Sequence, residues 1–291
     1  MLVIIGTIPD PHFPLVCGQV ERRNDQIFVD GHAFAMHRGT PALIGAAVET
    51  ARTLGHPMPH VFLIGDEGLG HGSRKLYAHL VEHIHEPEPA TLVFHYLQPD
   101  VDWHNRILMA IDELCRPRPQ LIADAGFMYA AKMSGFASSY DLFTPDMGEL
   151  AFLADETAPH PFYTRGFILH NNSDAPALIQ RAYAHDNAAA HLLVKGNTDM
   201  FATNTKCHWQ LDSPSSEAME AMGGTGDTLT GICATLINAK HPLPQACFLA
   251  ALTNRLAGQV CHPTPETQVI EIINAIPKAL EMAIKQSSTR Q

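Results

Sequence analysis

Short apolar runs alternate with longer segments of helical periodicity along most of the 291-residue chain. The runs are rich in Val, Ile, Leu and Phe, and this alternation is typical of βα units that build a mostly parallel sheet. Strands are predicted at residues 2–5, 27–30, 61–65, 91–96, 121–124, 141–143, 166–169 and 192–194. Helices are predicted between them, at residues 41–54, 72–85, 103–115, 146–154 and 174–188.

The pattern changes after Gly226, where helical segments follow one another at about 227–239, 244–260 and 266–284. Residues typical of breaks, namely Pro, Gly and Thr, separate these segments. The chain contains no repeat, no low-complexity tract and no long linker. We therefore expect a single α/β domain over residues 1–291, with a helical C-terminal third packed on the sheet.

Charge and cysteine content exclude several classes of function. Acidic residues outnumber basic ones by 30 to 19, and the basic residues are scattered. A nucleic-acid-binding surface or a contact with anionic membranes is therefore not expected, and an anion must be held locally. Six widely spaced cysteines, with no signal peptide and no apolar span of about 20 residues, favour a soluble, reduced protein of the cytoplasm.

The segment GGTGD at residues 223–227 joins a glycine-rich turn to the start of an apolar helix. Such a turn leaves backbone N–H groups unpaired at the positive end of the helix dipole, where a phosphate or an oxyanion binds. Asp227 would lie beside that anion as a general base that takes a proton from a hydroxyl group. An ordinary helix cap after a glycine turn explains the motif equally well.

Three other segments place polar residues at the ends of predicted strands, where open α/β sheets bind ligands. Lys195 and Gly196 follow one strand, and Lys195 could contact either a nucleotide phosphate or solvent. Asp146 and Glu149 lie one helical turn apart and could hold a hydrated Mg²⁺, although a capped helix also accounts for them. Asp124 ends another strand and could equally cap a turn.

A histidine pattern on a predicted helix suggests a different chemistry. His79 to His83 match the HxxEH pattern of zinc proteases. The chain has 18 histidines, so this spacing is expected by chance, and no third ligand follows it. We therefore expect no zinc site there.

Taken in order, the four strand-end segments resemble the ribokinase-like superfamily, and most closely its NAD(P)H-hydrate dehydratase branch. DAG at 124–126 is similar to a DAD-like strand end, and TPDMGE at 144–149 to a TPHPGE-like turn. KGNT at 195–198 is similar to an LKG-x-x-T turn, and GGTGD to a GGTGDVLAG-like helix start. The resemblance covers residues 117–284 and implies a three-layer α/β/α fold with a mostly parallel central sheet.

The resemblance also implies an activity, in which ATP or ADP drives removal of water from the hydrated nicotinamide ring of NADH or NADPH. Asp227 is then the catalytic carboxylate. The other implied assignments are the nucleotide phosphates on Gly223, Gly224, Thr225 and Gly226, further nucleotide contacts from Lys195, Gly196 and Thr198, substrate contacts from Asp124, Asp146 and Asn254, and Mg²⁺ on Asp146 and Glu149.

The sequence departs from this pattern at the TPHPGE-like turn, where Asp146 and Met147 replace the family's histidine and second proline. The resulting Asp-x-x-Glu is closer to the Asn-x-x-Glu metal motif of the kinases. A small-molecule kinase acting on a sugar, vitamin or thiazole therefore remains an alternative. A nucleotide-binding sensor without turnover is a third.

Two further departures concern the N-terminal part. The family's GPGLG-like turn has two candidate positions, either residues 65–72 or residues 98–100 after the strand at 91–96. Residues 1–40 carry two predicted strands where one is expected. The extra hairpin could cover a sheet edge or build a subunit contact, and we expect a homo-oligomer.

Overall fold

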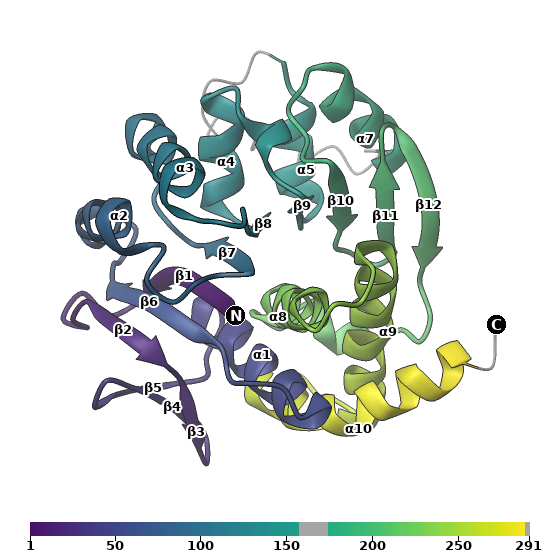
Figure 1. Ribbon diagram of the computed structural model, residues 1–291. Helices are drawn as coiled ribbons and strands as arrows, with labels where there is room; N and C mark the ends of the chain where they lie inside the picture. Colours follow the sequence, from purple (N-terminus) through teal and green to yellow (C-terminus); the bar gives the residue numbers. More distant parts are fainter. Residues whose placement is uncertain (157–173, 289–291) are drawn as a thin grey trace.

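The computed structural model describes residues 1–156 and 174–288, so the strand predicted at 166–169 lies outside the described residues (Figure 1). The central sheet has the order β12-β11-β10-β9-β8-β7-β1-β6-β2. Its middle strands run parallel to one another, as predicted. They are β1 (Leu2–Ile8), β6 (His60–Gly65), β7 (Thr91–His95), β8 (Gln120–Ala123), β9 (Leu142–Phe143) and β10 (His191–Val194).

Antiparallel strands that the sequence did not predict complete both edges of this sheet. The hairpin β11 (Asp199–Thr203) and β12 (Lys206–Leu211) extends one edge, and β2 (Val16–Gln19) pairs with β6 at the other. Along β12 exposed and half-buried residues alternate, so it lacks the continuous apolar run by which the central strands are recognised.

The N-terminal segment covers the sheet edge, which is the first of the two roles expected for it, but it forms more than a hairpin. After β2 the chain forms a separate small sheet of β3 (Glu21–Arg23), β4 (Gln26–Val29) and β5 (His32–Ala35). Of these strands only the one at 27–30 was predicted, because the others are short and largely exposed.

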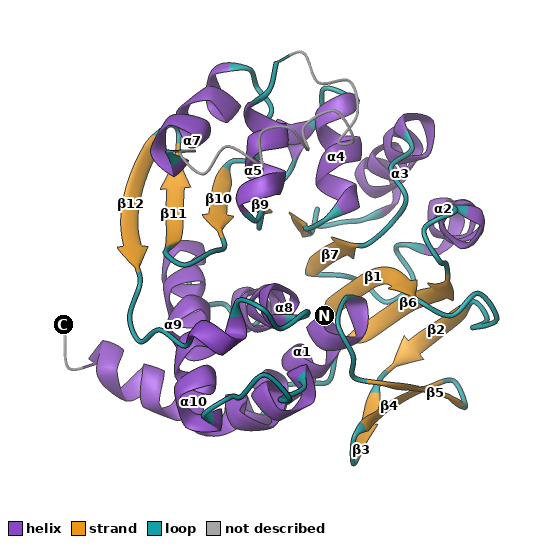
Figure 2. Ribbon diagram, turned by 180° about the vertical axis from the view of Figure 1, so that it is seen from behind, coloured by secondary structure: helices purple, strands orange, loops and turns teal. Residues whose placement is uncertain are grey.

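Helices cover both faces of the sheet, which confirms the three-layer α/β/α fold (Figures 1 and 2). One face carries α2 (His71–His83), α3 (Val101–Leu114), α4 (Gly126–Met133), α5 (Met147–Ala154) and α7 (Ala175–Ala184). The other carries α1 (Thr40–Leu54), α8 (Thr225–Asn238), α9 (Leu243–Cys261) and α10 (Val269–Ser288). Each layer packs a separate apolar cluster against the sheet. The short helix α4 was not predicted.

Close packing of α8 on α1 determines where the glycine-rich turn lies. A Cβ atom at Gly231 of α8 would stand 2.2 Å from the carbonyl oxygen of Leu43 in α1, so only glycine allows this approach. The approach brings the start of α8 next to the start of α1, at the carboxyl ends of the parallel strands.

Two further properties of the described residues concern membrane-spanning helices and disulfides. None of the described helices has the length and apolar character needed to cross a membrane. All six cysteines are free thiols, in agreement with the expectation from their spacing.

Candidate active site

The four predicted segments converge at the carboxyl edge of the sheet, around a cavity of about 530 Å³. Three of them meet because β8, β9 and β10 are parallel neighbours, so the residues that follow these strands share one edge. The glycine-rich segment reaches the same edge through the packing of α8 on α1. The predicted residues that line the cavity are Asp124, Asp146, Glu149, Lys195, Gly196, Gly224, Thr225, Gly226, Asp227 and Asn254. Thr198 is not part of this lining, and Gly223 lines the adjacent cavity.

The glycine-rich turn has the backbone conformation that the anion-hole prediction requires. Gly224 precedes α8 with φ +108°, and a Cβ atom there would lie 2.9 Å from a methyl group of Val269. No side chain caps this end of α8. The Thr225 hydroxyl instead donates to the carbonyl of Met219, so the first N–H groups of the helix stay available to an anion.

Asp227 lies in the first turn of α8 with a side chain that is only 13% exposed. Its Oδ2 accepts the backbone N–H of Gly39 at 2.7 Å, and its Oδ1 lies 3.0 Å from His95 Nε2. Burial alone would raise the pKa of Asp227. The hydrogen bond from His95, the charge of Lys195 and the Gly39 N–H outweigh burial and lower this pKa below its ordinary value.

His95, the partner of Asp227, was not selected from the sequence. It ends β7 and is fully buried. Its position at the end of an apolar strand was a usable signal, since three other strand-end residues were selected by that criterion. Strand β7 lies beside β8, so residues 98–100, the second of the two candidate positions, follow the strand next to β8.

Lys195 is buried and paired rather than directed into solvent. Its Nζ lies 2.8 Å from both carboxylate oxygens of Asp124. Burial alone would lower the pKa of Lys195, but the charges of Asp124, Glu149 and Asp227 raise it above its ordinary value. Lys195 therefore balances the charge of Asp124 within the site.

Asp146 and Glu149 form a capping box at the start of α5. Asp146 Oδ1 accepts the N–H of Glu149 and Glu149 Oε2 accepts the N–H of Asp146, both at 2.8 Å. Burial, and then the charge of Asp146, raise the pKa of Glu149 well above its ordinary value. One oxygen of each carboxylate remains outside the box, and both residues line the cavity, so the pair has the oxygen donors that Mg²⁺ prefers.

Asn254 of α9 braces the start of α8. Its Oδ1 accepts the Thr228 hydroxyl at 2.7 Å, and its Nδ2 donates to the carbonyl of Thr225 at 3.0 Å. Arg255, which was not selected from the sequence, lies at the rim of the same cavity. Its guanidinium binds Asp199 at 2.7 Å and also donates to two carbonyls of the 195–198 turn.

Two further cavities adjoin the first one. The larger, about 860 Å³, lies on the other side of Tyr96 and shares Tyr96, Asp146 and Glu149 with it. Tyr96 follows His95, is 52% exposed and has φ +51°, a strained conformation for a tyrosine. Such strain is frequent at functional sites.

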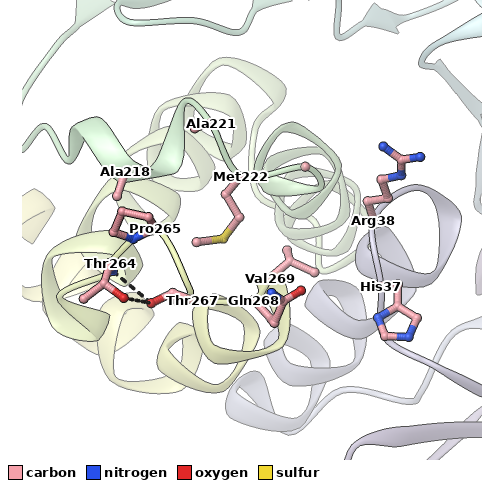
Figure 3. A pocket seen from close by; sticks show the side chains of 11 residues that line it. His37, Arg38, Ala218, Ala221, Met222, Thr264, Pro265, Thr267, Gln268 and Val269 are labelled. Atoms are coloured by element: carbon pink, nitrogen blue, oxygen red, sulfur yellow. Dashed lines mark hydrogen bonds between the residues drawn. The ribbon is translucent and has the colours of Figure 1, made fainter.

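The other cavity, about 450 Å³, lies beside Gly223 (Figure 3). Met222, Val269 and Gln268 face its interior, whereas the Arg38 guanidinium points away from it. Arg38 also lines the 860 Å³ cavity, and its side chain packs on Gly223.

The HxxEH histidines contact each other and a neighbouring acid. His79 and His83 stack on α2 at 4.3 Å, and His83 pairs with Glu86. Within the described ranges, the grouping of metal-ligand side chains is His95, Asp124 and Asp227. Lys195 binds both carboxylate oxygens of Asp124, so the charge of that member of the grouping is balanced by a side chain.

Comparison with known proteins gives matches that differ in coverage. The family model for carbohydrate kinase, described as NAD(P)H-hydrate dehydratase, matches residues 99–278. An uncharacterized protein of Methanocaldococcus jannaschii is 39% identical over 244 residues, which cover 84% of this chain and 100% of that protein. A bifunctional NAD(P)H-hydrate repair enzyme of Hyperthermus butylicus is 33% identical over 96 residues, which cover 32% of this chain and 17% of that enzyme.

Similar solved structures support the fold. A ribokinase-like superfamily protein of Enterococcus faecalis has a TM-score of 0.58 at 15% identity, covering 97% of this chain and 87% of its own. A hydroxyethylthiazole kinase of Pyrococcus horikoshii has a TM-score of 0.57 at 14% identity, covering 98% and 90%. A pyridoxal kinase of Staphylococcus aureus in complex with AMP-PCP and pyridoxal has a TM-score of 0.54 at 11% identity, covering 88% of this chain and 88% of its own. The fold is therefore ribokinase-like.

Proposed function

The chain belongs to the NAD(P)H-hydrate dehydratase family, and we propose that it uses ATP or ADP to remove water from hydrated NADH or NADPH. The observation that carries this proposal is the position of Asp227. Its carboxylate lies in the first turn of a helix whose N–H groups are uncapped, inside a cavity bordered by all four family segments. A base next to an anion hole fits a reaction that moves a phosphoryl group onto a hydroxyl.

In the proposed reaction Asp227 takes the proton of the ring hydroxyl, and the hydroxyl oxygen attacks the terminal phosphorus of the nucleotide. The bond to the leaving phosphate oxygen breaks, and the N–H groups of the turn at Gly223, Gly224 and Gly226 stabilise the charge on the transferring group. The phosphorylated ring carbon then loses phosphate with its C–O electron pair. Loss of a proton from the ring restores the reduced nicotinamide.

The two larger cavities offer places for the two reactants. The 530 Å³ cavity, with the glycine turn and Arg255, suits the nucleotide, and the 860 Å³ cavity suits the ring that carries the hydroxyl. Tyr96 lies between them and exposes an aromatic face on which a planar ring can stack. Arg38 lines the 860 Å³ cavity, forms no ion pair with another described residue, and is available to a phosphate there.

Mg²⁺ is the metal that this chemistry implies. Asp146 and Glu149 would hold it through the carboxylate oxygens outside the capping box, and it would neutralise charge on the nucleotide phosphates.

A small-molecule kinase is the second candidate, and the replacement of the family's histidine by Asp146 favours it. The same base and anion hole would phosphorylate a hydroxyl and stop there. The fold similarity to kinases of pyridoxal and hydroxyethylthiazole agrees with this alternative.

Turnover assays separate these functions. The purified protein, with Mg²⁺ and ATP or ADP, should restore the absorbance of reduced nicotinamide from hydrated NADH. Nucleotide consumption only in the presence of a vitamin or sugar alcohol would replace the dehydratase with a kinase, and nucleotide binding without turnover on any acceptor would indicate a sensor.

A variant tests the role of Asp227 itself. Asp227→Asn should lower kcat at least about 100-fold, which is the contribution typical of a general base, and leave ADP binding within a few-fold. Asp212→Asn, at an exposed acid, is the matched control and should keep full activity. Undiminished activity of Asp227→Asn would refute the assigned role.

A further inference from the structure

The groups that hold Asp227 come from a part of the chain that the family model does not match. Asp227 lies within the matched residues 99–278, but Gly39, Thr40 and His95 all precede them. Gly39 stands at the start of α1 with φ +84°, which turns its N–H toward Asp227 Oδ2. The N-terminal third of this chain therefore supplies the partners of the proposed base.

Both ring nitrogens of His95 are engaged. Nε2 lies 3.0 Å from Asp227 Oδ1, and Nδ1 lies 3.0 Å from the Thr40 hydroxyl. Because a carboxylate only accepts, an ionised Asp227 requires a proton on Nε2. The Thr40 hydroxyl can then donate to a bare Nδ1 and hold that tautomer.

Close packing fixes the ring in this position. His95 is fully buried, and its carbonyl and Thr40 both crowd Gly6 of β1, where a Cβ atom would stand 2.7 Å from each. The ring of Tyr96 meets that of His95 edge-on at 4.6 Å. Little freedom is left for the imidazole to turn away from Asp227.

Other charged and titratable groups also face this pair. Asp124, at the end of β8, lies 3.9 Å from His95 Nε2, and Lys195 after β10 binds Asp124. Glu149 of α5 and Tyr96 complete the set through their charge interactions with Lys195 and Asp227. Lys195 offsets only one of the two buried carboxylates, so Asp227 depends on the donors of His95 and Gly39.

The row of Thr40, His95 and Asp227 has the order of a nucleophilic triad, but Thr40 is poorly placed to act as the nucleophile. It borders the 860 Å³ cavity, yet it is only 1% exposed and its hydroxyl is engaged with His95 Nδ1 at 3.0 Å. Asp227, in contrast, lines the 530 Å³ cavity.

We propose that His95 is a positioning residue that holds the Asp227 carboxylate through Nε2–H and keeps it ionised to accept the substrate's hydroxyl proton. This rests on the proposed function of Asp227. The lowered pKa of Asp227, to which the hydrogen bond from His95 contributes, agrees with it. Without the imidazole, fewer Asp227 carboxylates would be ionised at a given pH, and those would be less well oriented.

Two substitutions test the proposal. His95→Leu should lower kcat roughly 10- to 100-fold, the effect of losing a hydrogen bond to a charged group, and move the acid limb of the pH–rate profile to higher pH. The KM for ATP should change less than about three-fold. His95→Gln keeps an N–H donor and should restore most of kcat and of the profile.

His104→Leu is the matched control, because His104 is equally buried but lines neither of the two larger cavities. It should lower stability and leave the pH–rate profile in place. A His95→Leu profile that does not move, or a His95→Gln variant as slow as His95→Leu, would overturn the proposal.

A measurement on the ring itself separates this proposal from the proposed function. Long-range ¹H–¹⁵N spectra at pH 7, with His95 assigned by its loss in His95→Gln, should show a protonated Nε2 whose signal shifts in Asp227→Asn. A bare Nε2 in the wild type overturns the proposal even if the enzyme is active. A protonated Nε2 in a protein with no turnover on any acceptor would leave the pairing intact, refute the proposed function and remove the catalytic role of His95.

Discussion

Replacing Lys195 with Met tests whether this lysine is a structural partner of Asp124. Met keeps much of the aliphatic stem but removes the ammonium, which binds both Asp124 oxygens at 2.8 Å. Asp124 is 1% exposed, so its charge would remain buried without a counter-ion. Breaking one partner of a buried pair costs about 3–5 kcal/mol. The Thr230 hydroxyl and the N–H of Ala125 would still donate to Asp124 in the variant. We therefore expect the lower end of that range, a loss of about 3 kcal/mol in the free energy of unfolding.

Urea denaturation at pH 7, monitored by far-UV circular dichroism, measures this loss of folding stability. A typical domain is stable by about 5–15 kcal/mol, so the variant should still fold. The double variant Asp124→Asn/Lys195→Met removes the stranded charge and should recover at least about 1 kcal/mol. Because the pKa of Lys195 is raised, its contribution is complete below the ordinary value of about 10.4, so the loss should be constant between pH 6 and pH 9.

A Lys195→Met variant within about 1 kcal/mol of the wild type would refute this reasoning. Lys195 would then have to be solvated in the free protein, as in the alternative that the sequence left open. In that case its main effect would appear in the affinity for ADP, measured by calorimetry on the same variant.

Two other substitutions have outcomes that follow from local geometry. Gly224→Ala should lower the free energy of unfolding by about 1–3 kcal/mol and weaken ADP binding, because Gly224 has φ +108° and a Cβ atom there would lie 2.9 Å from Val269. Gly196→Ala is the control and should change stability little, because a Cβ atom at Gly196 would meet no atom nearer than 3.8 Å. Glu149→Gln should be more stable than the wild type at pH 7 and equal to it near pH 4. Because folding raises the pKa of Glu149, the folded wild-type protein loses stability as the pH rises above the ordinary pKa of a glutamate. Mg²⁺ should narrow that difference by stabilising the wild type alone, and an identical melting-temperature shift in both proteins would place the ion elsewhere.

The central layer of the fold was predictable because its strands are buried on both faces and therefore consist of continuous apolar runs. The edge strands were not, since β12 and β3 alternate in exposure or are largely polar, and pairing with a neighbour rather than composition makes them strands. Helix α4 is too short for periodicity to reveal, and it follows Ala125 with φ +52°, a turn that its sequence does not announce.

Within the site, the residues that end parallel strands were predictable from chain order. Parallel strands bring their carboxyl ends to one edge, so Asp124 and Lys195 had to approach one another. Asp227 follows the antiparallel hairpin β11–β12, and the packing of α8 on α1 brings it to the same edge. Which of them pair is a different question, because it depends on distances of a few ångströms between elements far apart in the chain. Gly39 and Asp227, in contact at 2.7 Å, are 188 residues apart in the chain, and His95 and Asp227 are 132 residues apart. The four segments therefore meet at one cavity, whereas the hydrogen-bond partners of Asp227 come from N-terminal residues outside them.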